Sequence, residues 1–188
     1  MYVFNDSKPA THSEGRIRQE EKLKRKRLVG IHAWALMNNH YHMLVSECVE
    51  SGIPHFMKKM NMGYAKYFNE RYERSGALWQ GKYRKVHIRR DAHFLYIPYY
   101  IHLNPLDYSH PEWRKGGVRN TGKAVKALEQ YRWSSYLDYI GVSNFKSLIT
   151  TSLLKEVLGS QKQQEKTIAN ILHDPLLASS SDSIELHR

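Results

Sequence analysis

The chain has 188 residues, with 29 Lys or Arg against 18 Asp or Glu and a formal net charge of +11. This length fits one domain of ordinary size, and the single cysteine, Cys48, excludes a disulfide framework and a cysteine-based zinc cluster. Without a membrane-length apolar run or a signal peptide, we expect a cytoplasmic protein. The positive charge, together with 13 Tyr and 4 Trp, favours nucleic acid as the partner.

The first predicted elements are a basic helix and a β-hairpin. Residues 14–27 form a weakly amphipathic pattern in a segment crowded with Lys and Arg. Apolar residues alternate with their neighbours over 31–37, which is typical of a strand, and a second strand follows over 40–45. Asn38-Asn39 between the strands predicts a tight turn, because Asn tolerates positive φ.

Helices are predicted over most of the remaining chain. Apolar residues at every third or fourth position after Ile53 indicate a helix that ends near Gly76. Asp91 can cap another helix, in which Pro98 is expected to cause a kink. The helix that Asp91 caps is predicted over 92–103. The other predicted elements are an extended segment at 78–90, a loop at 107–123, and short helices at 124–129, 134–140 and 148–158.

This order of elements predicts an α+β fold with helices packed on an antiparallel sheet. It also predicts three regions along the chain. These are a basic polar segment over 1–30, the functional domain over 31–160, and a C-terminal helix with a flexible tail over 161–188.

Two pairs of residues point to chemistry. His40 and His42 are two apart on a strand, so both imidazoles project from one face and could hold a metal ion, although the pair alone is a weak indication. Tyr100 and Asn104 are four apart on a helix and share a face. A tyrosine nucleophile beside an amide oxygen that ligates a metal would suit phosphoryl transfer. The alternative is an aromatic helix face buried in the core, with Tyr96 and Tyr99.

Four ordered motifs resemble one family. Residues 33–45, around His40-Tyr41-His42, look like the His-hydrophobic-His strand of the single-tyrosine HUH transposases, and most closely that of the REP-associated tyrosine transposases, relatives of the smallest insertion-sequence transposases. Segments 76–83, 100–105 and 131–136 are similar to this family's later motifs. The resemblance covers about 31–141. It implies a ferredoxin-like antiparallel sheet with helices on its faces, the HUH endonuclease fold.

The resemblance also assigns roles to residues. Tyr100 would attack single-stranded DNA to form a 5′-phosphotyrosine and release a 3′-OH, with Tyr99 and Tyr96 as competitors. Tyr100 is preferred because it shares a face with Asn104, whereas Tyr99 points about a quarter turn away. His40, His42 and Asn104 would hold Mg²⁺ or Mn²⁺. The expected protein is a transposase, or a domesticated relative, that cleaves and rejoins DNA.

The expected partner is single-stranded DNA folded as a hairpin from palindromic repeats, with a homodimer as one arrangement of the protein. Only thirty mostly polar residues precede Ile31, where the family has an additional strand and a longer helix. A sheet that lacks the first strand is therefore expected, and the alternative function is a catalytically inactive DNA or RNA hairpin-binding protein from a truncated element. Candidate DNA-binding residues are Lys58, Lys59, Lys66, Lys82, Tyr83, Arg84, Lys85, Arg89 and Arg90, with Trp34 and Trp79 as candidates for base stacking, although burial in the core suits both tryptophans better.

Overall fold

A computed structural model describes residues 26–88, 91–174 and 177. Almost all of the helix predicted over 14–27 lies outside these ranges, as do Arg89 and Arg90. In chain order the elements are β1 (Val29–Leu36), β2 (Tyr41–Glu47), α1 (Gly52–Arg71), α2 (Asp91–Leu103), η1 (Asn104–Tyr108), η2 (Pro111–Lys115), α3 (Thr121–Gln130), α4 (Tyr136–Tyr139), η3 (Lys146–Leu148), α5 (Ser152–Leu158) and α6 (Gln161–His173), where η marks a 3₁₀ helix.

A two-stranded antiparallel sheet with several helices confirms the predicted α+β class. The described chain forms two compact units. One comprises 26–30 and 46–84, and the other comprises 31–45 and the described residues from 85 onward. None of the described helices is both long enough and apolar enough to cross a bilayer.

The first unit is built around α1. Gly52 begins this helix beside the Leu28 carbonyl, and a Cβ at position 52 would collide with that carbonyl. After α1, Gly76 adopts a φ of 91°, in the left-handed region that favours glycine. The Gly76 carbonyl accepts a hydrogen bond from Nδ2 of Asn69, at 3.0 Å. This turn directs the following segment back along α1, where Nε1 of Trp79 donates to the Asn61 carbonyl at 3.0 Å.

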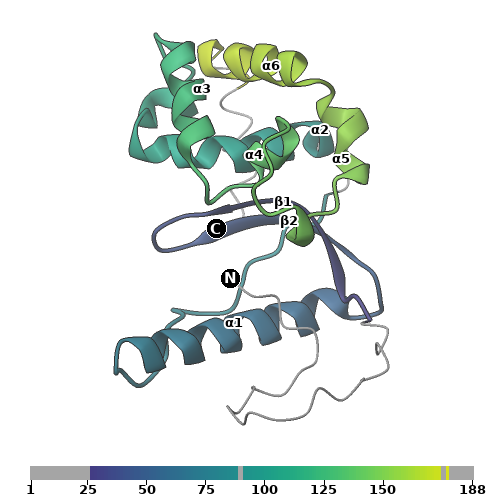
Figure 1. Cartoon of the computed structure of the whole chain (residues 1–188), viewed down its shortest axis with the longest axis vertical. Helices are drawn as coiled ribbons and strands as arrows, with labels where there is room; N and C mark the ends of the chain where they lie inside the picture. The colour runs from purple at the N-terminus through teal and green to yellow at the C-terminus, as the bar shows by residue number, and fades with distance from the viewer. Residues whose placement is uncertain (1–25, 89–90, 175–176, 178–188) are drawn as a thin grey trace. The chain divides into compact units, whose positions relative to one another are not determined.

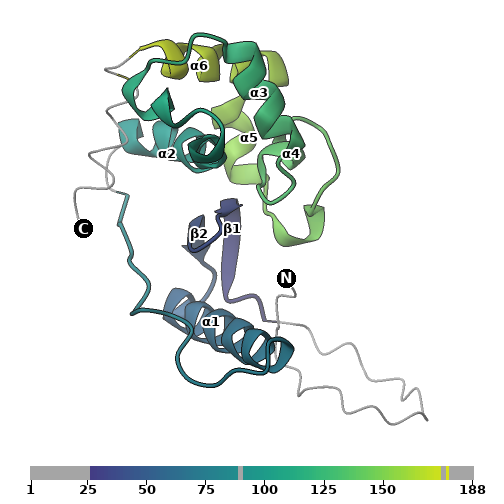
Figure 2. The same ribbon diagram turned by 90° about the vertical axis from the view of Figure 1, so that its left-hand side faces the viewer.

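In the second unit, helices α2 to α6 gather on one side of the β-hairpin (Figures 1 and 2). The core lies among these helices and includes Leu103, Leu106, Trp113, Tyr136 and Leu172, all almost completely buried. Helix α6 packs against both α3 and η2, and α2 packs against α5. Ile97, Ile101 and Leu103 of α2 contribute to this core.

The outer edge of β1 is closed by the chain that follows α3. The backbone N–H of Leu36 donates to the Trp133 carbonyl at 2.8 Å, and that of Ser135 donates to the Trp34 carbonyl at 2.9 Å. The Tyr131 hydroxyl donates to the Leu36 carbonyl at 2.6 Å. The motif at 131–136 therefore satisfies backbone groups of β1 that a further strand would otherwise pair with.

The hairpin turn differs from the prediction in its backbone. Met37 N–H donates to the His40 carbonyl at 2.8 Å, so the turn does lie at Asn38-Asn39. Outside glycine, however, the described residues with positive φ are Ser51 and Glu73. The turn is instead held by side chains, because the Tyr108 hydroxyl accepts a 2.7 Å hydrogen bond from the Asn38 N–H.

Three further expectations can be compared with the structure. The segment predicted as extended over 78–90 forms no strand in its described part, 78–88, because its charged side chains lie on both sides of the chain and leave no apolar face to bury. The segment predicted as a loop over 107–123 contains η2, part of η1 and the start of α3, because Trp113 and Val118 anchor it in the core. Helix α2 includes Pro98 within its bounds, as predicted, and burial of its last two turns offsets the cost of the proline.

We predict that replacement of Tyr131 by Phe lowers the free energy of unfolding by about 1 kcal/mol at neutral pH, because the hydrogen bond to Leu36 is lost. Burial, with a smaller contribution from Tyr108, raises the pKa of Tyr131 from 10.0 to about 12. The unfolded chain therefore ionises first, and the stability that this hydroxyl contributes is complete below pH 10 and is lost by about pH 12.

Urea unfolding of the wild type and of Tyr131→Phe across this pH range tests the prediction. The difference between the two proteins should shrink as the pH rises. Tyr72→Phe is the matched control, because Tyr72 is 62% exposed and loss of its hydroxyl should not change the free energy of unfolding. A difference in the free energy of unfolding that stays constant up to pH 12 would contradict the hydrogen bond between Tyr131 and Leu36.

Candidate active site

Helix α2 and the turn after it bring Tyr100 and Asn104 together. Asn104 is the first residue of η1, and its Nδ2 donates to the Tyr100 carbonyl at 2.7 Å. Both side chains are buried, with 3% of Tyr100 and none of Asn104 exposed. The predicted pairing on one helix turn is present, and it lies within the core.

The two histidines lie at the start of β2. Their ring centroids are 4.9 Å apart with the planes almost perpendicular, and His42 lies partly buried while His40 is exposed. Nδ1 of His40 lies 2.7 Å from Oδ1 of Asn39. Such a contact fixes the orientation of the imidazole and makes Nε2 the nitrogen that would bind a cation.

The strand and the helix meet where His42 faces Tyr100. The two ring centroids are 5.5 Å apart, with an interplanar angle of 82°. Residues 58 positions apart in the sequence are thus in direct contact. This contact joins the two pairs that sequence analysis singled out independently.

Sequence analysis did not identify Arg114, which lies at the centre of the site. Its guanidinium donates to Oδ1 of Asn104 at 2.9 Å and forms two hydrogen bonds with the Asp107 carboxylate, at 2.8 and 3.0 Å. It also hydrogen-bonds the Tyr100 side chain and lies 5.7 Å from the centre of that ring. Nothing in the sequence distinguishes it from 28 other Lys or Arg residues, except that it follows a tryptophan.

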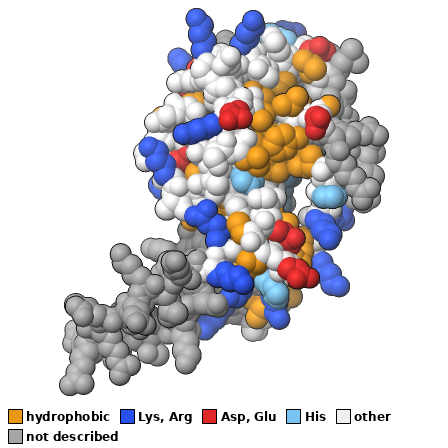
Figure 3. Space-filling model, turned by 90° about the vertical axis from the view of Figure 1, so that its right-hand side faces the viewer, with side chains coloured by type: hydrophobic (Ala, Val, Ile, Leu, Met, Phe, Trp, Pro, Cys, Tyr) orange, Lys and Arg blue, Asp and Glu red, His pale blue; other side chains and the backbone are white. Residues whose placement is uncertain are grey.

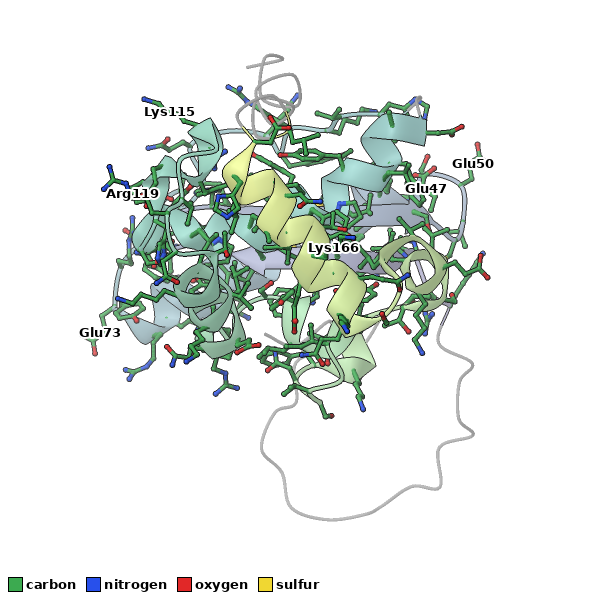
Figure 4. The ribbon with its side chains drawn as sticks, turned by 90° about the horizontal axis from the view of Figure 1, so that it is seen from above. Glu47, Glu50, Glu73, Lys115, Arg119 and Lys166 are labelled. Carbon is green, nitrogen blue, oxygen red and sulfur yellow. The ribbon has the colours of Figure 1, made fainter. Side chains whose placement is uncertain are left out.

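The surroundings of Arg114 keep it charged. Burial alone would lower the pKa of Arg114, but the hydrogen bonds and charges of Asp107 and Tyr100 outweigh this effect and raise it above its usual value. Trp113 helps to hold the carboxylate, because its Nε1 donates to Oδ1 of Asp107 at 2.7 Å. The adjacent Lys115 instead points away from the ribbon (Figure 4).

The orientation of α2 is fixed from its opposite side by His102. This residue is buried, its pKa is lowered by burial to about 3, and it is therefore neutral. Its Nε2 lies 2.8 Å from Oγ of Ser135, which in turn accepts a 2.9 Å hydrogen bond from the Trp34 N–H. The motif 131–136 thus links α2 to β1.

The other two candidate tyrosines have different surroundings. Burial raises the pKa of Tyr99, and a hydrogen bond to Thr167 of α6 partly offsets this rise. Tyr96 is partly buried and packs against the hydrophobic core. Tyr100 packs against His42, and this contact favours it as the candidate nucleophile.

A divalent cation fits the two imidazoles better than it fits Asn104. The described residues contain no group of three His, Cys, Asp or Glu side chains able to hold a metal ion. His40 and His42 supply two adjacent nitrogen donors. Oδ1 of Asn104, the third predicted ligand, accepts a hydrogen bond from a guanidinium in this arrangement, and the positive charge of that group disfavours a second cation beside it.

The candidate DNA-binding residues lie mainly on α1 and the segment after it. Lys and Arg side chains are distributed over the face shown in Figure 3. Trp34 is buried and contacts Phe145, so it cannot stack on a base, whereas Trp79 is partly exposed. Apart from Tyr83, which is partly buried, the described candidates are exposed: Lys58, Lys59, Lys66, Lys82, Arg84 and Lys85.

A family model described as "Transposase IS200 like" matches residues 13–104, just under half of the chain. No curated protein and no solved structure matches the chain. The matched segment contains His40, His42 and Tyr100 and ends at Asn104. It confirms the resemblance found in the sequence, and residues 13–104 are similar to IS200-like transposases. This similarity indicates a transposase-type function that acts on DNA.

We predict that Ser135→Ala lowers the free energy of unfolding by about 1–3 kcal/mol, because it leaves buried polar groups of Trp34 and His102 without their partner. Ser109→Ala is a matched control, since Ser109 is exposed and its Oγ also lies 2.8 Å from a histidine, His110. Loss of the Ser109 hydroxyl should lower the free energy of unfolding by less than about 0.5 kcal/mol. If Ser135→Ala and Ser109→Ala lower the free energy of unfolding equally, the buried hydrogen bonds of Ser135 do not hold α2 in place.

Proposed function

We propose that the protein cleaves and rejoins single-stranded DNA, folded as a hairpin, through a covalent 5′-phosphotyrosine on Tyr100. It would act in DNA transposition as a transposase or a domesticated relative, within a ferredoxin-like HUH fold. The contact between His42 and Tyr100 carries this proposal. Within a family-matched segment, it brings a potential metal ligand to the ring of a potential nucleophile.

The reaction would be a transesterification. The Tyr100 oxygen attacks the phosphorus and forms a new P–O bond, and the bond from phosphorus to the 3′ oxygen breaks. The proton lost by the phenol ends on the released 3′-OH. Because one phosphoester bond is exchanged for another, no external energy source is needed. Rejoining is the reverse attack by a 3′-OH on the phosphotyrosine. His40, His42 and Asn104 would hold Mg²⁺ or Mn²⁺, which polarises the phosphate when bound.

Arg114 would assist by holding the phenol oxygen. A neutral phenol is a weak nucleophile, and a guanidinium hydrogen-bonded to it stabilises the negative charge that develops as the proton leaves. Asp107 orients the guanidinium through its two hydrogen bonds. Because Tyr100 is 3% exposed, DNA must displace the groups that cover the phenol before attack.

A second candidate is hairpin binding without cleavage. The burial of Tyr100 and the bond between Arg114 and Asn104 favour it, since both disfavour the geometry that catalysis with a metal needs. The intact set of His40, His42, Tyr100 and Asn104 favours the enzyme. The two candidates differ in whether a covalent DNA adduct forms.

Incubation with labelled hairpin oligonucleotides and Mn²⁺, followed by a denaturing gel, should show a protein–DNA adduct. The oligonucleotides should be drawn from palindromes that flank the gene. Tyr100→Phe should abolish the adduct and leave binding in a native gel unchanged, because only the attacking oxygen is lost. Tyr99→Phe is the control and should keep the adduct. A native-gel shift without any adduct would support the binding protein, and an adduct that survives in Tyr100→Phe would exclude Tyr100.

Arg114→Gln should slow adduct formation by about 100-fold, the usual effect of removing one charged donor from a reacting oxygen. Arg114→Lys should recover part of this loss, because lysine keeps the charge but not the planar fork. Lys115→Gln, an outward-pointing neighbour, should not change the rate (Figure 4). Rates are to be compared below each variant's unfolding transition. A faster Arg114→Gln would mean that the guanidinium blocks Asn104 and does not assist Tyr100.

A further inference from the structure

Five aromatic side chains form a continuous group in the first unit, which we call the aromatic ladder: Tyr64, Tyr67, Phe68, Tyr72 and Trp79. Four lie on α1 or directly after it, at spacings of three or four residues that place them along one side of the helix. Trp79 joins them because the turn at Gly76 folds its segment back. The sequence motif 76–83 therefore completes this surface.

Four ring contacts join the members of the ladder, and three of them are made by Tyr64. The ring of Tyr64 lies 6.5 Å from Tyr67, 6.0 Å from Phe68 and 5.7 Å from Trp79, measured between centroids. Phe68 and Tyr72 are 4.5 Å apart. All four pairs are tilted by about 40°, so the rings lie side by side and present faces as well as edges.

The ladder is exposed to an extent that core packing does not explain. Tyr64 is 42%, Tyr67 59% and Tyr72 62% exposed. Large aromatic residues are usually buried at least in part, and exposed clusters of them mark binding surfaces. The buried residues of α1 lie near its start, at Gly52, Phe56 and Met57, so the ladder occupies the part of the helix that contributes least to the core.

Charge identifies the chemistry of the partner. Residues 52–84 contain seven Lys or Arg and two Glu. Two of the cations lie on the ladder itself, with Arg71 5.9 Å from the ring centre of Tyr72 and Arg74 5.6 Å from that of Phe68. Flat aromatic faces between cations match the bases and phosphates of a single strand, because bases stack on rings while phosphates pair with cations.

We infer that the aromatic ladder binds unpaired bases of a nucleic acid strand by stacking. Paired bases are stacked on each other and cannot offer their faces, so the partner is single-stranded and not duplex. The inference deepens the proposed function, on which it rests for the identity of the strand as DNA. The stacking itself requires neither Tyr100 nor a metal ion, and it can therefore be tested without cleavage.

The test is a titration of the full chain with a fluorescein-labelled oligothymidylate of about 16 nucleotides, in the presence of EDTA. Tyr67→Ala and Tyr72→Ala should each weaken binding about tenfold, within the range found for one lost stacking partner. Tyr67→Phe keeps the ring and should bind like the wild type. Met62→Ala is the matched control on the same helix, because Met62 is 62% exposed and is not aromatic.

Two further readouts separate base stacking from phosphate pairing and from a loss of folding. The dependence of affinity on salt should have the same slope in Tyr67→Ala as in the wild type, since no cation is removed. A duplex of equal length should bind the wild type and Tyr67→Ala equally. Circular dichroism and sedimentation of each variant report folding and self-association.

Unchanged oligothymidylate binding in both alanine variants would overturn the inference. So would equal weakening in Tyr67→Phe and Tyr67→Ala, which would assign the effect to the hydroxyl. A change in self-association with unchanged DNA binding would make the ladder an interface between copies of the chain. Because this titration does not measure adduct formation, a protein that fails to cleave DNA still gives a clear result here.

Discussion

The pairing of β1 with the segment that follows α3 is the interaction on which the rest of the second unit depends. A two-stranded hairpin alone is marginally stable in water. Here Trp133 and Ser135 bond to the outer edge of β1, and Ser135 also reaches His102 on α2, which carries the proposed nucleophile. One segment therefore closes the sheet edge and fixes the rotation of α2. That rotation determines which tyrosine of α2 faces His42.

The electrostatics of the site follow from this arrangement. Once α2 is oriented, Tyr100 and Asn104 both face Arg114, whose charge is balanced by Asp107. The partly buried cation is paired, which offsets the cost of removing its charge from water. Because the same guanidinium contacts the candidate nucleophile and the candidate third metal ligand, it connects the two halves of the proposed chemistry.

The parts of the structure that depend on local pattern could be predicted from the sequence. The alternation over 31–37, the helical period after Ile53 and the spacing of Tyr100 and Asn104 all gave elements that the structure contains. The segment after Gly76 and the turn at Asn38-Asn39 were harder, because long-range contacts from Trp79 and Tyr108 decide their conformation. No local pattern carries that information.

The same limit applies to the site. His40, His42, Tyr100 and Asn104 were recognisable because spacing on a strand or helix is visible in a sequence. Arg114 was not, because its contact with Asn104 arises only when η2 folds back onto the end of α2, ten residues further along the chain. The role of His102 was hidden for a similar reason, since its partner Ser135 lies 33 residues away.

The central claim is that Tyr100 becomes covalently attached to DNA, and peptide mass spectrometry of the trapped adduct tests it most directly. Trypsin should release residues 91–114 as one peptide, bounded by Arg90 and Arg114 and containing Tyr96, Tyr99, Tyr100 and Tyr108. After nuclease treatment, fragment ions should place the residual nucleotide on Tyr100. A nucleotide on any other tyrosine, or an adduct that lies outside this peptide, would contradict the account.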